Sequence, residues 1–199
     1  ILRGLVGSEM CIRDSPKENI QKGLQLAKQS LSIRPDFASA LSLAVSLEMM
    51  TGNHEDACKK IDKILKNKET MFETALGAAG AHNCGDLELA ISNYEYVFNT
   101  APHFSSWARN LYSYALVENG DFDKALKFFE VELQKEHAFG GFSQTMYLLS
   151  AYINKKRGNE EKAREFFEKQ KSEDGKGKSA QRIRGELSML KNKSFIDEL

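Results

Sequence analysis

Apolar side chains recur at intervals of three and four residues along most of the chain, with polar side chains between them. This period is that of an amphipathic α-helix, whose apolar stripe faces a core. No segment shows the sustained alternation that is typical of a half-buried strand. The pattern therefore predicts an all-α protein, with one helix over 17–33 and four helix pairs after it. The pairs are expected at 37–50 with 54–66, 71–83 with 87–99, 104–118 with 122–135, and 142–157 with 160–171.

A glycine stands between the two helices of each predicted pair, followed by Asp or Asn and, five positions after the glycine, by alanine. Glycine allows the left-handed turn that ends a helix, and Asp or Asn can cap the next one. The small alanine permits close approach of two helices, and a large apolar residue four positions later shares its face. A glycine spacing of 33 to 38 residues indicates a repeated helix-turn-helix unit. The four sets are Gly52, Ala57 and Ile61; Gly85, Ala90 and Tyr94; Gly120, Ala125 and Phe129; Gly158, Ala163 and Phe167.

Over residues 17–171 these units resemble the tetratricopeptide repeat (TPR) family. That family also carries a proline about twelve residues after the alanine. Pro102 follows Ala90 at this spacing. Pro35 follows Gly23 at the same spacing, in an earlier half-unit where Gly23 replaces the alanine. Glu132 departs from the family pattern, which usually has a small residue there. The resemblance implies an α-solenoid of antiparallel helix pairs that acts as a non-catalytic scaffold for protein–protein interaction.

The resemblance also implies a concave groove lined by the first helix of each pair. Three aromatic residues among the matching positions offer the large amphipathic area that is enriched at binding hot spots. For one of them, Trp107, packing between helices is an equally good interpretation. The family's clamp for a C-terminal carboxylate needs Lys and Asn where this chain has Ser42 and Ser46, which disfavours chaperone-tail binding. A protein or peptide partner is expected to contact Met49, His82, Asn83, Trp107, Asn110, Tyr114, Tyr152, Lys155 and Lys156.

Both ends of the chain depart from the repeat pattern. Residues 1–15 lack its period and resemble a translated sequencing-adapter read, which implies a non-native leader; a genuine disordered or weakly helical leader is the alternative. The helical array itself is expected over 16–172. Residues 173–179, rich in glycine and charge, predict a linker. Residues 180–199 predict a C-terminal capping helix.

Two segments carry a narrower resemblance. Residues 101–126 and 186–199 look like the TPR region C-terminal to bacterial class III nucleotide cyclases, where the second segment continues into a closing helix. The resemblance therefore implies that the capping helix is truncated here. None of the cyclase domain's metal-binding aspartates or base-reading residues has a counterpart in this chain. The second hypothesis is thus a regulatory C-terminal fragment of a larger bacterial signalling enzyme, such as a class III adenylate or guanylate cyclase.

Composition and the lack of known motifs limit the functional classes that remain. Lys plus Arg and Asp plus Glu both number 28, so no overall charge favours nucleic acid or an anionic membrane. No apolar stretch reaches the ~18 residues that suggest a membrane-spanning helix. No HExxH, nucleophile elbow or glycine-rich strand–helix motif occurs. We therefore expect a cytoplasmic protein that is not an enzyme and has no catalytic, cofactor or metal site.

Cysteine and histidine positions suggest no further chemistry. Cys58 and Cys84 lie in separate helical segments without CxxC spacing, and Cys11 belongs to the leader. We expect Cys58 and Cys84 to be reduced thiols, buried or half-buried. None of the four histidines has a second ligand residue at zinc spacing.

Overall fold

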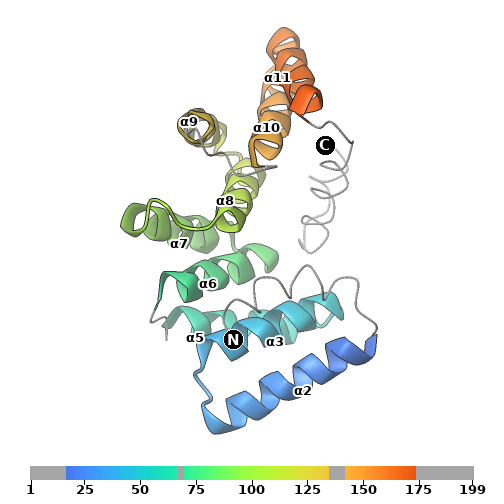
Figure 1. Cartoon of the computed structure of the whole chain (residues 1–199), viewed down its shortest axis with the longest axis vertical. Coiled ribbons are helices and arrows are strands. Elements are labelled where there is room, and N and C mark those ends of the chain that lie inside the picture. Colours follow the sequence, from blue (N-terminus) through green and yellow to red (C-terminus); the bar gives the residue numbers. More distant parts are fainter. Residues whose placement is uncertain (1–16, 67–69, 135–141, 174–199) are drawn as a thin grey trace. The chain divides into compact units, whose positions relative to one another are not determined.

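The computed structural model describes residues 17–66, 70–134 and 142–173 (Figure 1). All regular secondary structure in these ranges is α-helical. The chain divides into two compact units, which meet in the sequence between Cys84 and Gly85 and are described one at a time. We call them unit 1 and unit 2.

Several predicted features lie outside the described residues. They are the leader over 1–15, the capping helix over 180–199, and all of the 173–179 linker except Glu173, which ends the last described helix.

Unit 1 is built around one central helix, α3, which α2, α4, α5 and α6 all contact (Figure 1). Buried residues of α3 include Leu41 and Val45 on one face and Leu47 on another. A helix that is apolar on every side is expected to be covered on every side. The helices of unit 1 are α2 (Lys17–Ile33), α3 (Ala38–Met50), α4 (His54–Cys58), α5 (Ile61–Lys66) and α6 (Met71–Asn83).

Close approach of α5 to α6 depends on two glycines of α6. A Cβ placed on Gly77 would collide with Leu65, and one placed on Gly80 would collide with Ile61. Both α5 side chains lie over the α6 backbone, so a side chain at either glycine would have to displace them. Unit 1 thus packs by bringing backbones together.

Aromatic rings contribute strongly to the core of unit 2. Tyr94 and Phe129 are fully or almost fully buried. The ring centroids of Tyr112 and Phe128 lie 4.9 Å apart, and those of Tyr112 and Phe98 lie 5.6 Å apart. Such distances fall within the favourable range for aromatic pairs. Its helices are α7 (Leu87–Thr100), α8 (Ser106–Glu118), α9 (Phe122–Leu133), α10 (Phe142–Lys156) and α11 (Glu160–Glu173).

The predicted repeat is confirmed at the turns and in the core. The four turn glycines have φ between 74° and 84°, a left-handed conformation that glycine adopts without strain. The alanine is buried in all four repeats. Three of the four apolar residues four positions later are buried as well, and the exception is Phe167, which is 42% exposed.

The predicted capping residues stand at the N-caps, but the predicted cap contact forms at only one of three. Asn53, Asp86 and Asp121 are the N-cap residues of α4, α7 and α9. Only Asp86 among these three accepts a backbone N–H, that of Leu89 at 3.1 Å. The Asp121 carboxylate instead accepts from the Asn119 side chain.

The second helix of the first pair differs from the prediction of one helix over 54–66. It is divided into α4 and α5, with Lys59 and Lys60 in a turn between them. Cys58 ends α4 and forms a disulfide with Cys84, the C-cap residue of α6, with the two Cα atoms 5.7 Å apart. The expectation of reduced thiols was therefore wrong. Because the chain turns back between the two cysteines, a sequence separation of 26 residues becomes a direct contact.

Glu132, the departure from the family pattern, has a partner in unit 2. Its carboxylate accepts from the Arg109 guanidinium at 2.5 Å, and both side chains are buried. Arg109 also donates to the backbone carbonyls of Phe104 and Pro102. The guanidinium thus links α9 to the turn before α8, and Glu132 is large because it must reach this cation.

Candidate functional site: a pocket between the last two described helices

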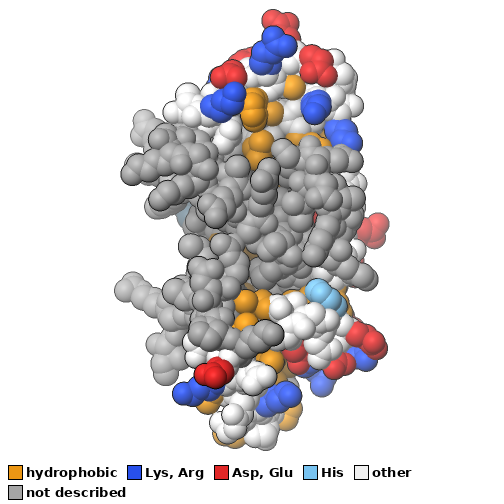
Figure 2. Space-filling view, turned by 90° about the vertical axis from the view of Figure 1, so that its right-hand side faces the viewer, with side chains coloured by type: hydrophobic (Ala, Val, Ile, Leu, Met, Phe, Trp, Pro, Cys, Tyr) orange, Lys and Arg blue, Asp and Glu red, His pale blue; other side chains and the backbone are white. Residues whose placement is uncertain are grey.

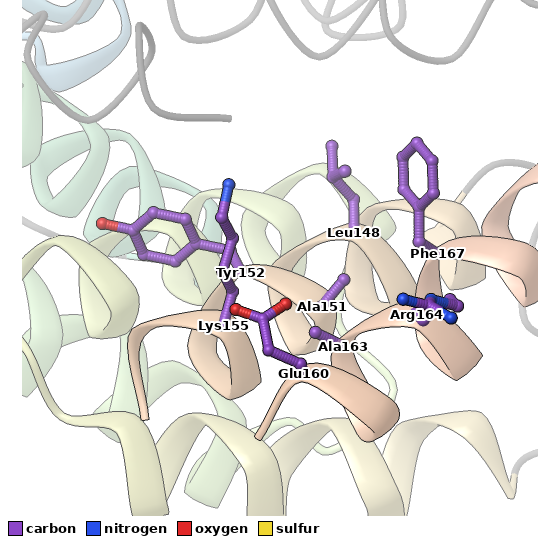
Figure 3. A pocket seen from close by; sticks show the side chains of 8 residues that line it. All are labelled: Leu148, Ala151, Tyr152, Lys155, Glu160, Ala163, Arg164 and Phe167. Atoms are coloured by element: carbon purple, nitrogen blue, oxygen red, sulfur yellow. The ribbon is translucent and has the colours of Figure 1, made fainter. Parts of the chain in front are cut away.

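A pocket of about 400 Å³ opens on one face of unit 2, between α10 and α11 (Figure 3). Small side chains, Ala151 and Ala163, form its buried part, and larger side chains stand around them. The lining residues are Leu148, Ala151, Tyr152 and Lys155 of α10, and Glu160, Ala163, Arg164 and Phe167 of α11.

Helical period explains why α10 lines this pocket. Leu148, Tyr152 and Lys155 recur at intervals of four and three residues and so share one face. Met146, Leu149 and Ile153 occupy another face of α10 and are fully buried in the core of the unit. One helix therefore serves both the core and the pocket.

On α11, Glu160, Arg164 and Phe167 follow the same spacing. Phe167 is 42% exposed, whereas its counterparts Tyr94 and Phe129 are 0% and 1% exposed. Leu148 and Phe167 project to the same side of the helix pair in Figure 3. The pocket thus exposes an apolar side chain at a position that the earlier repeats bury.

Charged groups surround this apolar surface. Lys155 and Arg164 supply two cations and Glu160 one carboxylate, all three on exposed residues. The Lys156 ammonium lies 5.5 Å from the centre of the Tyr152 ring, within cation–π range. Figure 2 shows hydrophobic side chains among Lys, Arg, Asp and Glu at the end of unit 2 formed by α10 and α11. The surroundings therefore suit a ligand that combines apolar and charged groups.

Two of the predicted groove residues, Tyr152 and Lys155, line the pocket, and Lys156 stacks on the first of them. Trp107 and Asn110 lie on α8, which packs beside α10, and both are half-buried. The ring of Trp107 also packs edge-on against Phe104, with the centroids 6.4 Å apart. Trp107 therefore has a structural contact beside any binding role.

Asn110 carries an unusual polar group. Its Oδ1 atom is buried and has no hydrogen-bond partner among the described residues. Unsatisfied buried acceptors are uncommon in folded proteins.

Three predicted groove residues are buried, which corrects the expectation that they face a ligand. Tyr114 is 0% exposed, and His82 and Met49 are 2% and 5% exposed. Their helices α8, α6 and α3 are each covered by neighbouring helices on more than one side. His82, Met49 and the half-buried Asn83 belong to unit 1, whereas the pocket residues belong to unit 2.

Sequence reasoning missed the α11 side of the pocket, because only first helices were considered. The sequence does contain a sign of it. Phe167 is the last of the four apolar residues that follow a repeat alanine by four positions, and Glu160 and Arg164 share its helix face. Among the described residues no helix follows α11, and Phe167 is exposed at the position that the earlier pairs bury.

Within residues 17–66, 70–134 and 142–173, no helix is long and apolar enough to cross a membrane. Over the same residues, His, Cys, Asp and Glu form no group of three or more that could hold a metal ion.

Comparison with known proteins agrees with the helix-pair architecture. Residues 144–176, which include most of α10 and all of α11, match the tetratricopeptide repeat family model. The fold is that of TPR proteins. Among curated proteins, none matches the sequence.

Solved TPR structures resemble most of the chain. The crystal structure of MamA is 16% identical, with a TM-score of 0.64 over 80% of this chain and 91% of that one. YrrB, described as a TPR protein with an unusual peptide-binding site, is 16% identical, with a TM-score of 0.63 over 84% of both chains. A TPR protein from Parabacteroides merdae is 20% identical, with a TM-score of 0.55 over 88% of this chain and 66% of that one. At these identities the TPR likeness concerns the fold.

The narrower resemblance to the region that follows nucleotide cyclases stays a prediction. One of its two segments, 186–199, lies outside the described residues. Reading the gene upstream of residue 16 tests it: an encoded cyclase domain would support the resemblance, and a start codon followed only by repeats would contradict it.

Proposed function

We propose that this chain is a non-catalytic, cytoplasmic scaffold that binds a protein or peptide partner at the pocket between α10 and α11. The observation that carries the proposal is the exposure of Phe167 at a position where Tyr94 and Phe129 are buried. Apolar surface rimmed by polar residues marks interaction sites. The peptide-binding site named for YrrB adds that this fold supports such binding in another protein.

The pocket favours a ligand segment with an apolar side chain next to an acidic one. The apolar side chain enters above Ala151 and Ala163, between Leu148 and Phe167. An acidic neighbour is attracted by Lys155 and Arg164 at the rim. Fully burying an aliphatic or aromatic side chain contributes roughly 1.5–3 kcal/mol, whereas exposed charge pairs contribute about 0–1 kcal/mol. Affinity therefore comes mainly from the apolar group, and the charges select and orient the ligand.

The contact is expected to extend from the pocket along the first helices of unit 2. Tyr152 and Lys156 form a stacked pair next to the pocket, and Trp107 and Asn110 stand on the neighbouring α8. Tyr114, being buried, supports α8 and does not touch the ligand.

A peptide library selected for binding to the whole chain tests the proposal. We expect recovered sequences to carry an apolar residue beside Asp or Glu. Tyr152→Ala should weaken binding of a recovered peptide by at least ~1 kcal/mol, the scale of a hot spot. Tyr96→Ala is the matched control, since Tyr96 is exposed on α7 and away from the pocket. Equal affinity of both variants and the parent, with unchanged circular dichroism, would contradict the proposal.

Charge and occupancy are tested separately. Lys155→Glu should mainly slow association with an acidic peptide and flatten its dependence on salt, because rim charges act on encounter.

Removal of residues 174–199 tests whether the chain's own C-terminal segment occupies the pocket. A higher peptide affinity after truncation would identify that segment as a competing occupant, and an unchanged affinity would exclude it.

A further inference from the structure

The interruption between α4 and α5 is not encoded by its local sequence. Residues 54–66 contain neither proline nor glycine, and Lys59 and Lys60 are good helix formers. Ala57, Ile61 and Ile64 are all buried and keep one helical spacing across the interruption. Local sequence therefore favours one continuous helix, and the observed break needs another cause.

Hydrogen bonds at the break show how the backbone departs from an α-helix. The Lys60 N–H donates to the Ala57 carbonyl, three residues back, at 3.1 Å. In a continuous helix it would donate to Asp56, four residues back. The Asp56 carbonyl instead accepts from the Lys60 ammonium at 2.9 Å. A tightened turn inside a helical segment often marks a hinge or strain.

The disulfide lies directly at this break. Cys58 is the residue before Lys59, and its sulfur is bonded to Cys84 at the end of α6. Both cysteines are half-buried, so each residue retains some exposure to solvent. In reducing compartments most disulfides are transient, catalytic or redox-sensing. A partly exposed bond in a protein expected in the cytoplasm suits reversible use.

We propose that Cys58 and Cys84 form a reversible redox site that controls the continuity of the second helix of the first pair. With the bond formed, Cys58 is tied to the end of α6 and the helix remains divided into α4 and α5. A dithiol reductant transfers two electrons and two protons, which gives two protein thiols and the oxidised, disulfide form of the reductant. The freed segment 54–66 then forms one helix, and the Lys60 N–H bonds to the Asp56 carbonyl.

One competing cause of the break is an ion pair. The Lys60 ammonium lies 2.7 Å from Glu48 Oε2, and the Glu48 side chain is buried on α3. Attraction to this carboxylate could hold the Lys60 side chain over the break without help from the disulfide. The two causes differ in what reduction does, so an experiment distinguishes them.

Amide hydrogen exchange on the whole chain, before and after dithiothreitol, tests the proposal. A Cys11→Ser background leaves Cys58 and Cys84 as the only cysteines. We expect the Lys60 and Ile61 amides to exchange at least tenfold more slowly after reduction, while the Cys84 amide exchanges faster. A bond that only stabilised the fold would give faster exchange throughout unit 1 when reduced. Three outcomes would overturn the proposal. They are faster exchange throughout unit 1, unchanged exchange, and a bond that dithiothreitol reduces only after the protein unfolds.

Variants in the same background complete the test. Cys84→Ser should reproduce the reduced pattern without reductant and should not respond to dithiothreitol; Cys58→Ser serves if that variant does not fold. Lys60→Met, with the disulfide intact, should keep the fast exchange at Ile61. Slow exchange there without reductant would assign the break to the ion pair with Glu48 and would refute the redox site. Lys63→Met, on the exposed side of α5, is the matched control.

Discussion

Units 1 and 2 use the same helix-turn-helix repeat but fill their cores differently. In unit 1, Gly77 and Gly80 let α5 approach the α6 backbone, and the core is mostly aliphatic. In unit 2, the rings of Tyr94, Tyr112 and Phe129 occupy the space between helices. The repeat therefore fixes turns and helix directions but leaves packing distance free. Unit 1 should be sensitive to added volume and unit 2 to lost volume.

The largest expected effect is loss of volume in unit 2. Phe129 is 1% exposed, and Phe129→Ala should lower the free energy of unfolding by roughly 3–5 kcal/mol because it leaves a cavity. Val131→Ala on the same helix is the control, since Val131 is exposed and should change stability by less than about 0.5 kcal/mol. Urea titration measures both. Equal midpoints for the two variants would mean that the ring does not fill the core.

Next comes the buried ion pair of unit 2. Glu132→Ala strands the Arg109 guanidinium without its carboxylate and should cost about 3 kcal/mol. Replacing both partners, as in Arg109→Met with Glu132→Leu, should restore most of that loss, since an apolar pair carries no desolvation penalty. Glu130→Ala, at an exposed site of α9, is the control. A double variant less stable than the single one would show that Arg109 matters mainly for its backbone contacts.

Added volume in unit 1 should have a smaller effect. Gly80→Val pushes a branched side chain into Ile61 and Val45 and should cost roughly 1–3 kcal/mol. Ala79→Val, at the half-buried neighbouring position, is the control. Thermal unfolding of both variants checks the difference. If Gly80→Val matched its control, the close approach of α5 and α6 would not depend on glycine.

The smallest effect is a dependence on alkaline pH. Burial raises the pKa of the Tyr112 phenol, and Glu95, which accepts from its hydroxyl at 3.1 Å, adds to the rise. Above the unfolded pKa of about 10, the unfolded chain loses this proton while the folded chain retains it, so stability falls as pH rises. We expect the loss to be less than about 1.4 kcal/mol per pH unit and absent in Tyr112→Phe. Urea titrations of both proteins at pH 9 and pH 11 measure it, and parallel behaviour would contradict it.

Local features of the fold could be read from the sequence. The predicted bounds of α2 and α6 coincide with the observed ones, Lys17–Ile33 and Met71–Asn83, because helical period and the residues at helix ends act locally. The Cys58–Cys84 bond and the Arg109–Glu132 pair join residues 26 and 23 positions apart. Such contacts depend on how helices pack, and a single sequence does not specify this.

The candidate site was predictable to the same extent. Tyr152 and Lys155 followed from their places on a first helix, and both line the pocket. Tyr114 has a comparable place but is buried, because burial depends on which sides of α8 the neighbouring helices cover. Phe167 was assigned to the core by its place in the repeat. Its exposure depends on whether another helix packs over the pair, and the repeat pattern does not encode this.

The turn glycines also give the backbone a definite handedness at each junction. Gly52, Gly120 and Gly158 have φ of 82°, 81° and 74°, and a Cβ built there would have no heavy atom within 4 Å. The obstacle to a side chain is therefore chirality and not space, since an L-residue is strained at positive φ and a D-residue is not. D-alanine adopts positive φ without strain, and it restricts the unfolded chain more than glycine does. At these turns the backbone has the conformation that a D-residue prefers and an L-residue avoids.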